Sequence, residues 1–143
     1  MDSQNFTFDR VMVVDDTQID RYIATHTLKK NQFAKECIEF DMATKAIQFL
    51  DENSDDHDKL PQLIFLDIRM PEMDGFQFLE QFAKLPPSVN EIHVIMLSSS
   101  LDPADHVRAE SIDAVKMFIN KPLNKINLEE IKALSLVLVL KNN

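Results

Sequence analysis

The stretch Leu63-Ile64-Phe65-Leu66-Asp67-Ile68-Arg69-Met70-Pro71-Glu72-Met73-Asp74-Gly75-Phe76 contains the only glycine among the 143 residues of the chain. It opens with four apolar residues that end on the carboxylate of Asp67, and a proline and the glycine follow. A short apolar run bounded by turn residues is typical of a buried strand. We therefore predict a strand over residues 63–66 that places Asp67 at the edge of a sheet. Because glycine tolerates positive φ and close packing, Gly75 is expected to let the chain turn into the next helix.

Four more apolar runs alternate with segments of helical spacing on both sides of this stretch. The runs cover residues 11–14, 37–40, 92–97 and 117–119, and the helical segments cover 19–30, 43–50, 76–82, 102–111 and the tail from 124. The expected inward positions of the first helical segment are Ile19, Tyr22, Ile23 and Leu28. Continuous apolar strands that alternate with helices indicate a parallel sheet covered by helices on both faces.

The composition is that of a globular protein of one domain, with 45% hydrophobic and 27% charged residues. The net charge of −9 argues against binding to nucleic acid or to anionic lipid. Cys37 is the only cysteine, so no internal disulfide can form. Residues 1–8 lack the pattern of a signal peptide, and the apolar run 134–140 is too short to span a bilayer. We expect a cytoplasmic protein.

Polar side chains stand at the carboxyl ends of four predicted strands, where open α/β sheets bind ligands. The first strand ends at Asp15 and Asp16, the third at Asp67, the fourth at Ser98 and the fifth at Lys121. Three neighbouring carboxylates repel one another, so either a pKa rises or a cation lies among them. Oxygen ligands suit Mg²⁺ better than zinc. A carboxylate beside a metal ion, a lysine and a hydroxyl is a plausible phosphoryl acceptor.

Each of these residues also has a simpler interpretation when it is taken alone. Asp15 and Asp16 could cap a helix, and Asp67 could belong to a turn. Ser98 could lie in an ordinary polar loop, and Phe118 on the fifth strand could be a core residue. Their joint occurrence at the ends of the predicted strands favours a functional site.

Residues from about 9 to 138 resemble the receiver domain of two-component response regulators. The matching motifs are Val13-Val14-Asp15-Asp16, the stretch from Leu66 to Gly75, Met96-Leu97-Ser98-Ser99 and Phe118-Ile119-Asn120-Lys121-Pro122. The resemblance implies a three-layer, doubly wound (βα)5 fold of the flavodoxin type, with a five-stranded parallel sheet in the order 2-1-3-4-5. It also implies that residues 1–143 form a single stand-alone receiver domain, similar to a chemotaxis regulator, with no output domain.

The resemblance assigns a phosphoacceptor and a metal site. Asp67 matches the residue that receives the phosphoryl group. Asp15, Asp16 and Asp67 match the carboxylates that bind Mg²⁺, and the backbone carbonyl of Arg69 matches a further ligand.

The resemblance also assigns a switch. Ser98 matches the hydroxyl that bonds the phosphoryl group, although threonine is commoner there, and Lys121 matches the lysine that contacts a phosphoryl oxygen. Phe118 matches the aromatic residue that turns inward when the hydroxyl moves. The peptide bond between Lys121 and Pro122 is expected to be cis. Many relatives carry a glycine before the fifth strand, whereas residues 113–116 contain none, so we expect this turn to differ.

These roles imply a phosphoacceptor signalling domain rather than an enzyme that turns over external substrates. The implied phosphodonor is a histidine kinase or a histidine phosphotransfer protein, and the output is binding to an unknown downstream protein. A phosphatase resembling the haloacid dehalogenases is disfavoured, because Arg69 occupies the position of its general acid. A flavin-binding module is disfavoured, because Asp15 and Asp16 stand where a phosphate-accepting loop is needed.

The tail leaves two interpretations open. Ile131, Leu134 and Leu138 share one face of the predicted last helix, whereas Leu136, Val137, Val139 and Leu140 lie elsewhere on it. A helix that is apolar all round is normally covered. The tail is therefore either a frayed end that folds back on the domain or a contact surface, including one for a homodimer through the last helix.

Overall fold

The computed structural model describes residues 5–141, with the side chains of residues 136–141 outside the description. The strands are β1 (Phe8–Val14), β2 (Ala34–Phe40), β3 (Leu63–Leu66), β4 (His93–Ser98) and β5 (Val115–Asn120). The helices are α1 (Gln18–Lys30), α2 (Ala43–Glu52), α3 (Gly75–Phe82), α4 (Pro87–Asn90), α5 (Pro103–Glu110) and α6 (Lys125–Lys141). The four-residue helix α4, which begins with a proline at its first position, was not predicted from the sequence.

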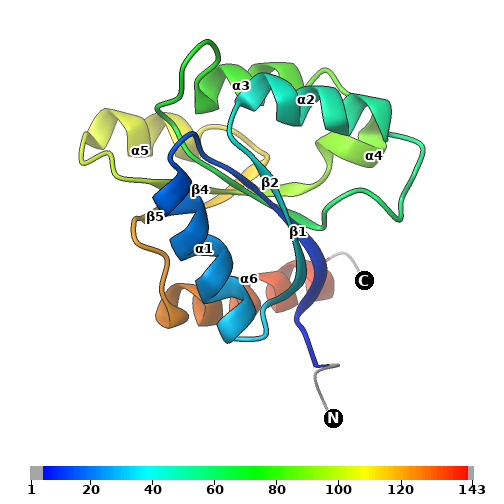
Figure 1. Ribbon diagram of the computed structural model, residues 1–143, viewed down its shortest axis with the longest axis vertical. Coiled ribbons are helices and arrows are strands. Elements are labelled where there is room, and N and C mark those ends of the chain that lie inside the picture. The colour runs from blue at the N-terminus through cyan, green and yellow to red at the C-terminus, as the bar shows by residue number, and fades with distance from the viewer. Residues whose placement is uncertain (1–4, 142–143) are drawn as a thin grey trace.

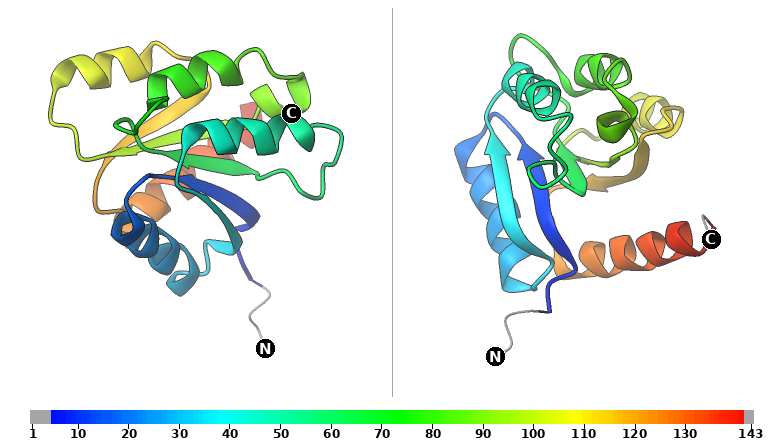
Figure 2. Two further views of the ribbon diagram at one scale, coloured as in Figure 1. Left: turned by 45° about the horizontal axis from the view of Figure 1, so that its top comes forward. Right: turned by 90° about the vertical axis from the view of Figure 1, so that its right-hand side faces the viewer.

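The strands form one parallel sheet in the order β2-β1-β3-β4-β5, which confirms the predicted doubly wound α/β fold. Helices α2, α3 and α5 cover one face of the sheet, and α1 and α6 cover the other (Figure 1; Figure 2). The strand order reverses between β1 and β3, so these two neighbours send their following segments to opposite faces. This is the position at which such sheets bind ligands.

The core consists of two layers, one on each face of the sheet. Met12 and Val14 of β1 belong to the layer under α2, α3 and α5, whereas Val11 and Val13 belong to the layer under α1 and α6. Successive side chains of a strand point to opposite faces, so a strand covered on both faces must be apolar at every position. This explains why the central strands appear in the sequence as unbroken apolar runs.

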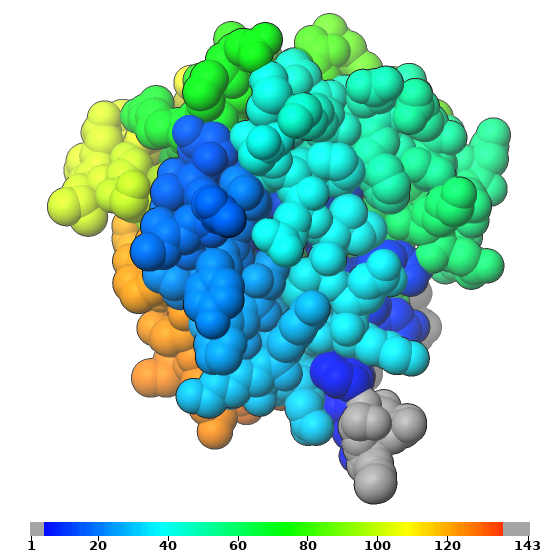
Figure 3. Space-filling view, viewed as in Figure 1, coloured from blue at the N-terminus to red at the C-terminus, as the bar shows by residue number. Residues whose placement is uncertain are grey.

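The predicted inward face of α1 is wrong at three of its four positions. Ile19 and Tyr22 are each 65% exposed and Ile23 is 38% exposed, whereas Leu28 is buried as expected. The other buried residue of α1 is Ala24. The polar residues of the first turn face the sheet edge instead, as described below, and this rotation leaves the apolar residues on the surface. Figure 3 shows α1, in blue, exposed along one side of the molecule.

The strand β5 contains an irregularity at the position where the sequence lacks a glycine. Val94 pairs with Val115 and Ile95 pairs with Met117, so Lys116 is an extra residue on β5. One extra residue in one strand is a β-bulge, which changes the face to which the following side chains point. Because of the bulge, Val115 and Phe118, three positions apart, pack against the same core layer, and Met117 packs against the other. None of residues 111–116 has positive φ.

Gly75 is required for close packing rather than for positive φ. It is the first residue of α3, its N–H donates to the carbonyl of Ile68 at 2.7 Å, and its φ is not positive. A Cβ at this position would lie 2.4 Å from the carbonyl oxygen of Asp67. The left-handed residue of this loop is Glu72, with φ of 69°. Of the two reasons that the sequence offers for Gly75, the structure supports close packing and not positive φ: the glycine lets α3 start directly against the backbone of Asp67.

The last helix confirms the prediction in part. Ile131 is buried and Leu134 is half-buried, so one face of α6 covers the sheet. The side chains of Leu136, Val137, Leu138, Val139 and Leu140 lie outside the described residues, and the homodimer through α6 stays a prediction. Within residues 5–141, no helix combines the length and the apolar character needed to cross a bilayer.

We predict that Gly75→Ala lowers the free energy of unfolding by about 2 kcal/mol, because the new methyl group forces the Asp67 backbone and α3 apart. Chemical denaturation measures this change. Gln81→Ala, at an exposed position of the same helix, is the matched control and is expected to change stability by less than about 0.5 kcal/mol. An alanine at position 75 that leaves stability unchanged or raises it would show that the close approach is not required.

Candidate functional site

The sheet brings the three predicted carboxylates together at its carboxyl edge. Asp15 is the residue after β1 and Asp67 is the residue after β3, and the two strands are hydrogen-bonded neighbours. One carboxylate oxygen each of Asp15, Asp16 and Asp67 lies within 4.8 Å of the others. Asp15 and Asp67 are only 3% and 6% exposed, whereas Asp16 is exposed to solvent. The strand topology therefore creates the predicted acidic cluster.

The local backbone fixes how these carboxylates point. The backbone N–H of Thr17 donates to Oδ1 of Asp15 at 2.9 Å, and the N–H of Ile68 donates to Oδ1 of Asp67 at 2.9 Å. Thr17, and neither aspartate, is the N-cap residue of α1. The simpler interpretation of Asp15 and Asp16 as helix caps is therefore wrong.

Lys121 lies among the carboxylates, as predicted. Its Nζ is 2.7 Å from Oδ2 of Asp15, 2.9 Å from Oδ2 of Asp20 and 3.5 Å from Oδ1 of Asp67. The lysine side chain is 13% exposed. One ammonium group is therefore shared by three carboxylates.

Asp20 was missed by the sequence analysis. It stands in the first turn of α1, which was expected to place Ile19 and not Asp20 toward the protein. The next residue, Arg21, also faces the edge, and its Nη1 donates to the backbone carbonyl of Asp15 at 2.8 Å. The sequence did offer one indication of their roles: both residues follow Asp15 within six positions, on the helix that begins next to the site.

Burial and the charge of Asp15 raise the pKa of Asp67 from 3.8 to about 6, although Lys121 and the N–H of Ile68 act in the opposite direction. Burial by itself lowers the pKa of Lys121, but its hydrogen bonds to Asp15 and Asp20 outweigh burial and raise that pKa above its usual range. The lysine therefore stays charged at neutral pH. The carboxylates remain in excess over the single cation among them.

This set of residues fits Mg²⁺. The donors are carboxylate oxygens, which magnesium prefers. Burial and the neighbouring charge of Asp15 make the ionised form of Asp67 costly, and a bound cation would offset that cost. Asp16 is the exposed member of the cluster, so an ion has access to it from solvent. Arg69 lies two residues after Asp67, and the role of its carbonyl as a ligand stays a prediction.

Ser98 is at the end of β4, beside the cluster, and is 1% exposed. Its hydroxyl oxygen accepts from the backbone N–H of Ser100 at 3.1 Å. Its carbonyl accepts from the backbone N–H of Lys121 at 2.9 Å, which ties the ends of β4 and β5 together. The peptide bond between Lys121 and Pro122 is cis, as the sequence predicts.

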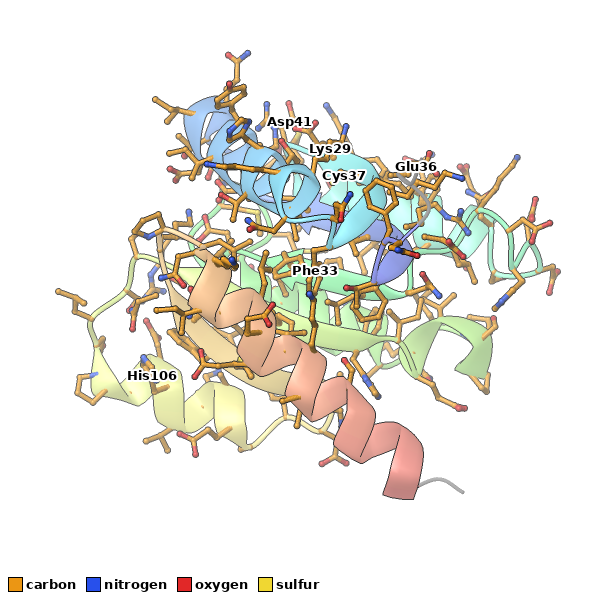
Figure 4. All side chains as sticks on the ribbon, turned by 90° about the horizontal axis from the view of Figure 1, so that it is seen from below. Lys29, Phe33, Glu36, Cys37, Asp41 and His106 are labelled. Atoms are coloured by element: carbon orange, nitrogen blue, oxygen red, sulfur yellow. The ribbon has the colours of Figure 1, made fainter. Side chains whose placement is uncertain are left out.

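Phe118 is half-buried on β5 and packs against the core layer under α5. Its ring lies against that of His106, with the ring centroids 3.7 Å apart, and Figure 4 shows His106 on α5. No pattern in the sequence predicts this contact of His106. The role of Phe118 as a switch stays a prediction.

A second carboxylate that the sequence analysis missed is Asp105 on α5, which is 7% exposed. Nη2 of Arg69 lies 2.9 Å from Oδ2 of Asp105, and the hydroxyl of Ser100 donates to the same oxygen. Arg69 and Ser100 belong to the loops that follow β3 and β4. Asp105 therefore connects two loops of the site to α5.

Residues 11–133 match the family model of the response regulator receiver domain. The chain is 34% identical over 125 residues to the histidine kinase CKI1 of Arabidopsis thaliana. The aligned region covers 82% of the chain and 11% of CKI1. It is also 30% identical over 128 residues to the two-component response regulator ORR1 of Oryza sativa subsp. indica, and this alignment covers 88% of the chain and 54% of ORR1. The chain thus spans a small part of one of these curated relatives and about half of the other.

Solved structures show the same similarity. A two-component response regulator from Cytophaga hutchinsonii superposes with a TM-score of 0.79 at 30% identity, over 89% of this chain and 98% of that one. A mutant receiver domain of CKI1 superposes with a TM-score of 0.73 at 29% identity, over 87% and 90% of the two chains. The chain belongs to the family of response regulator receiver domains. It is therefore a receiver domain of the kind used in two-component signalling systems.

The two alternative functions gain no support. The side chain of Arg69, which stands where a haloacid dehalogenase-like phosphatase needs its acid, is paired with Asp105. Asp15, which stands where a flavin-binding module needs a phosphate-accepting loop, is a buried carboxylate.

The raised pKa of Asp67 predicts how stability depends on pH without divalent cations. Because the folded state binds the proton more tightly than the unfolded state, this group costs stability as the pH rises from about 4 to about 6. We expect Asp67→Asn to equal the wild type in free energy of unfolding near pH 4 and to exceed it by about 2 kcal/mol at pH 7. Denaturation in the presence of a chelator at several pH values measures the difference. A difference that does not change with pH would contradict the raised pKa.

Proposed function

We propose that this receiver domain accepts a phosphoryl group on Asp67, with Mg²⁺ bound at the carboxyl edge of the sheet. The observation that carries the proposal is the position of the buried Asp67 carboxylate, which lies beside Asp15 and Asp16 and 3.5 Å from the ammonium nitrogen of Lys121. The membership of the chain in the receiver family and its likeness to response regulators support the same function.

The hydrogen bonds of Asp67 indicate which oxygen attacks. Oδ1 accepts from the N–H of Ile68 and lies near Lys121, whereas Oδ2 has no hydrogen bond among residues 5–141. With a pKa of about 6, the carboxylate is mostly ionised at neutral pH. Oδ2 forms a bond with phosphorus while the bond between phosphorus and the donor's imidazole nitrogen breaks, and the imidazole leaves with that electron pair.

Charge neutralisation is the main requirement of this transfer. Asp15, Asp16, Asp67 and the carbonyl of Arg69 would hold Mg²⁺, which would supply positive charge next to the phosphoryl oxygens. Lys121 reaches a phosphoryl oxygen by moving from its contact with Asp20 toward Asp67. The hydroxyl of Ser98, whose oxygen accepts from Ser100, can still donate its own proton to the phosphoryl group.

The switch begins at Ser98. Its movement toward the phosphoryl group carries the loop that follows β4, and Phe118, whose ring lies against His106 of α5, then turns inward. The surface formed by α5, β5 and α6 then changes and binds a downstream protein. The chain acts in the cytoplasm as a signalling domain and not as an enzyme for external substrates.

The phosphodonor in this proposal is a histidine kinase or a histidine phosphotransfer protein. CKI1, a histidine kinase with a segment similar to this chain, supports that class of partner. We also propose that residues 1–143 act as one receiver domain. The rice response regulator ORR12, 93% of which is covered by this chain at 30% identity, supports that organisation.

We predict that acetyl phosphate and Mg²⁺ add one phosphoryl group to the wild-type protein and none to Asp67→Asn, because the variant lacks the nucleophilic carboxylate. Intact-protein mass spectrometry measures the gain in mass. Asp51→Asn, at an exposed position of α2, is the matched control and should be labelled as the wild type is. A chelator should abolish labelling. Full labelling of Asp67→Asn would refute the assignment.

A further inference from the structure

Asp105 is a buried carboxylate outside the acidic cluster. It is the third residue of α5, and its side chain is 10% exposed. An ionised group at such depth must be paired or hydrogen-bonded, because its transfer from water is otherwise too costly. Both of its side-chain partners among residues 5–141, Arg69 and Ser100, bind the same oxygen, Oδ2. The carboxylate is therefore held by the site loops and not by the core of α5.

The two partners come from the loops that follow the neighbouring strands β3 and β4. Arg69 is two residues after Asp67, and Ser100 is two residues after Ser98. The backbone N–H of Ser100 donates to the Ser98 hydroxyl, and the side-chain amide of Asn120 donates to the carbonyl of Ser100 at 3.0 Å. Asp105 thus fixes the loop that bears the switch hydroxyl as well as the side chain of Arg69.

The pairing neutralises the cation nearest in sequence to the phosphoacceptor. The Arg69 side chain is 65% exposed, yet its ion-pair partner among the described residues is Asp105 alone. A phosphodonor is an anion, and it has to approach a cluster of carboxylates. A free guanidinium group two residues from Asp67 would attract that anion, whereas a guanidinium bound to a carboxylate does so far less.

We propose that Asp105 is a positioning residue that sequesters the Arg69 guanidinium and thereby slows the phosphorylation of Asp67 by anionic donors. The inference rests on the proposed function of Asp67. It gives α5 a connection to the site through Asp105, in addition to the contact between His106 and Phe118. Asp105 thus influences the rate of phosphorylation of Asp67 from α5, the helix whose outer surface changes in the proposed switch.

The test compares the second-order rate constant for phosphorylation by acetyl phosphate in the presence of Mg²⁺. Asp105→Asn is expected to raise it about threefold, because one carboxylate is removed and one guanidinium is released. The acceleration should shrink as sodium chloride is added, since salt screens the attraction of the released charge. A purely structural role for Asp105 predicts no such salt dependence.

Asp102→Asn is the matched control. It removes the same charge from the same turn of α5, and asparagine caps a helix as well as aspartate does. We expect its rate constant to remain within about twofold of the wild type, because Asp102 does not contact Arg69. An acceleration by Asp102→Asn equal to that by Asp105→Asn would overturn the inference, because the loss of any nearby charge would then explain it.

Two further variants remove the dependence on a single substitution. Arg69→Gln removes the guanidinium that Asp105 binds and keeps the backbone carbonyl of residue 69, so its rate constant is the reference for the double variant. In the Arg69→Gln background, Asp105→Asn should give no acceleration, because no guanidinium remains to be released. A full acceleration in the double variant relative to Arg69→Gln would overturn the inference even if Asp105→Asn alone proved unstable.

Amide hydrogen exchange of the metal-free protein gives a readout that does not depend on phosphorylation. The N–H of Ser100 should exchange faster in Asp105→Asn than in the wild type, because the loop loses its charged acceptor. Unchanged exchange of the Ser100 N–H would refute the proposed role of Asp105 in holding this loop. A wild-type protein that is not labelled would refute the proposed function together with the inference. Normal labelling of the wild type with no acceleration in Asp105→Asn would refute the inference alone.

Discussion

The ammonium group of Lys121 is the interaction on which the rest of the site depends. Two hydrogen-bonded strands, β1 and β3, end at the same edge of the sheet and hold Asp15 and Asp67 close together in a buried place. Like charges at this separation repel, and burial makes each more costly. Lys121, brought by the pairing of β5 with β4, offsets part of this cost through contacts of 2.7 Å and 3.5 Å to the two carboxylates. Burial and then the charge of Asp15 raise the pKa of Asp67, and the remaining excess of negative charge makes the edge receptive to a cation.

Helix α5 is where the site meets the outer surface of the domain. Its buried Asp105 binds Arg69 and Ser100, and its His106 lies on the ring of Phe118. These contacts join the loop after the phosphoacceptor, the loop after the switch hydroxyl and the strand β5 to one short helix. A change of charge at Asp67 therefore has two physical routes to the same surface, one through hydrogen bonds and one through packing.

The sequence predicts the central strands well, because a strand buried on both faces must be apolar throughout. It also places Asp15, Asp67 and Lys121 at the carboxyl ends of strands, where the structure brings them together. The strand order and the roles of Asp67 and Lys121 came from the family resemblance. The inward face of α1 was predicted wrongly, because the apolar spacing of Ile19, Tyr22 and Ile23 suits an exposed contact face as well as a buried one. The true inward positions there carry polar groups that bind the site. Asp20 and Asp105 escaped prediction because their partners lie 101 and 36 residues away in sequence, and local patterns carry no signal of such pairs.

The central claim is that the crowded carboxylates form a magnesium site. Isothermal titration calorimetry of the unphosphorylated protein with Mg²⁺ tests it most directly, with Asp16→Asn as the variant, because Asp16 is exposed and its replacement leaves the core intact. We predict that the wild type binds one Mg²⁺ ion saturably and that the affinity of Asp16→Asn for Mg²⁺ is at least about tenfold lower. Equal affinity of the two proteins for Mg²⁺, or no saturable binding by the wild type, would contradict it.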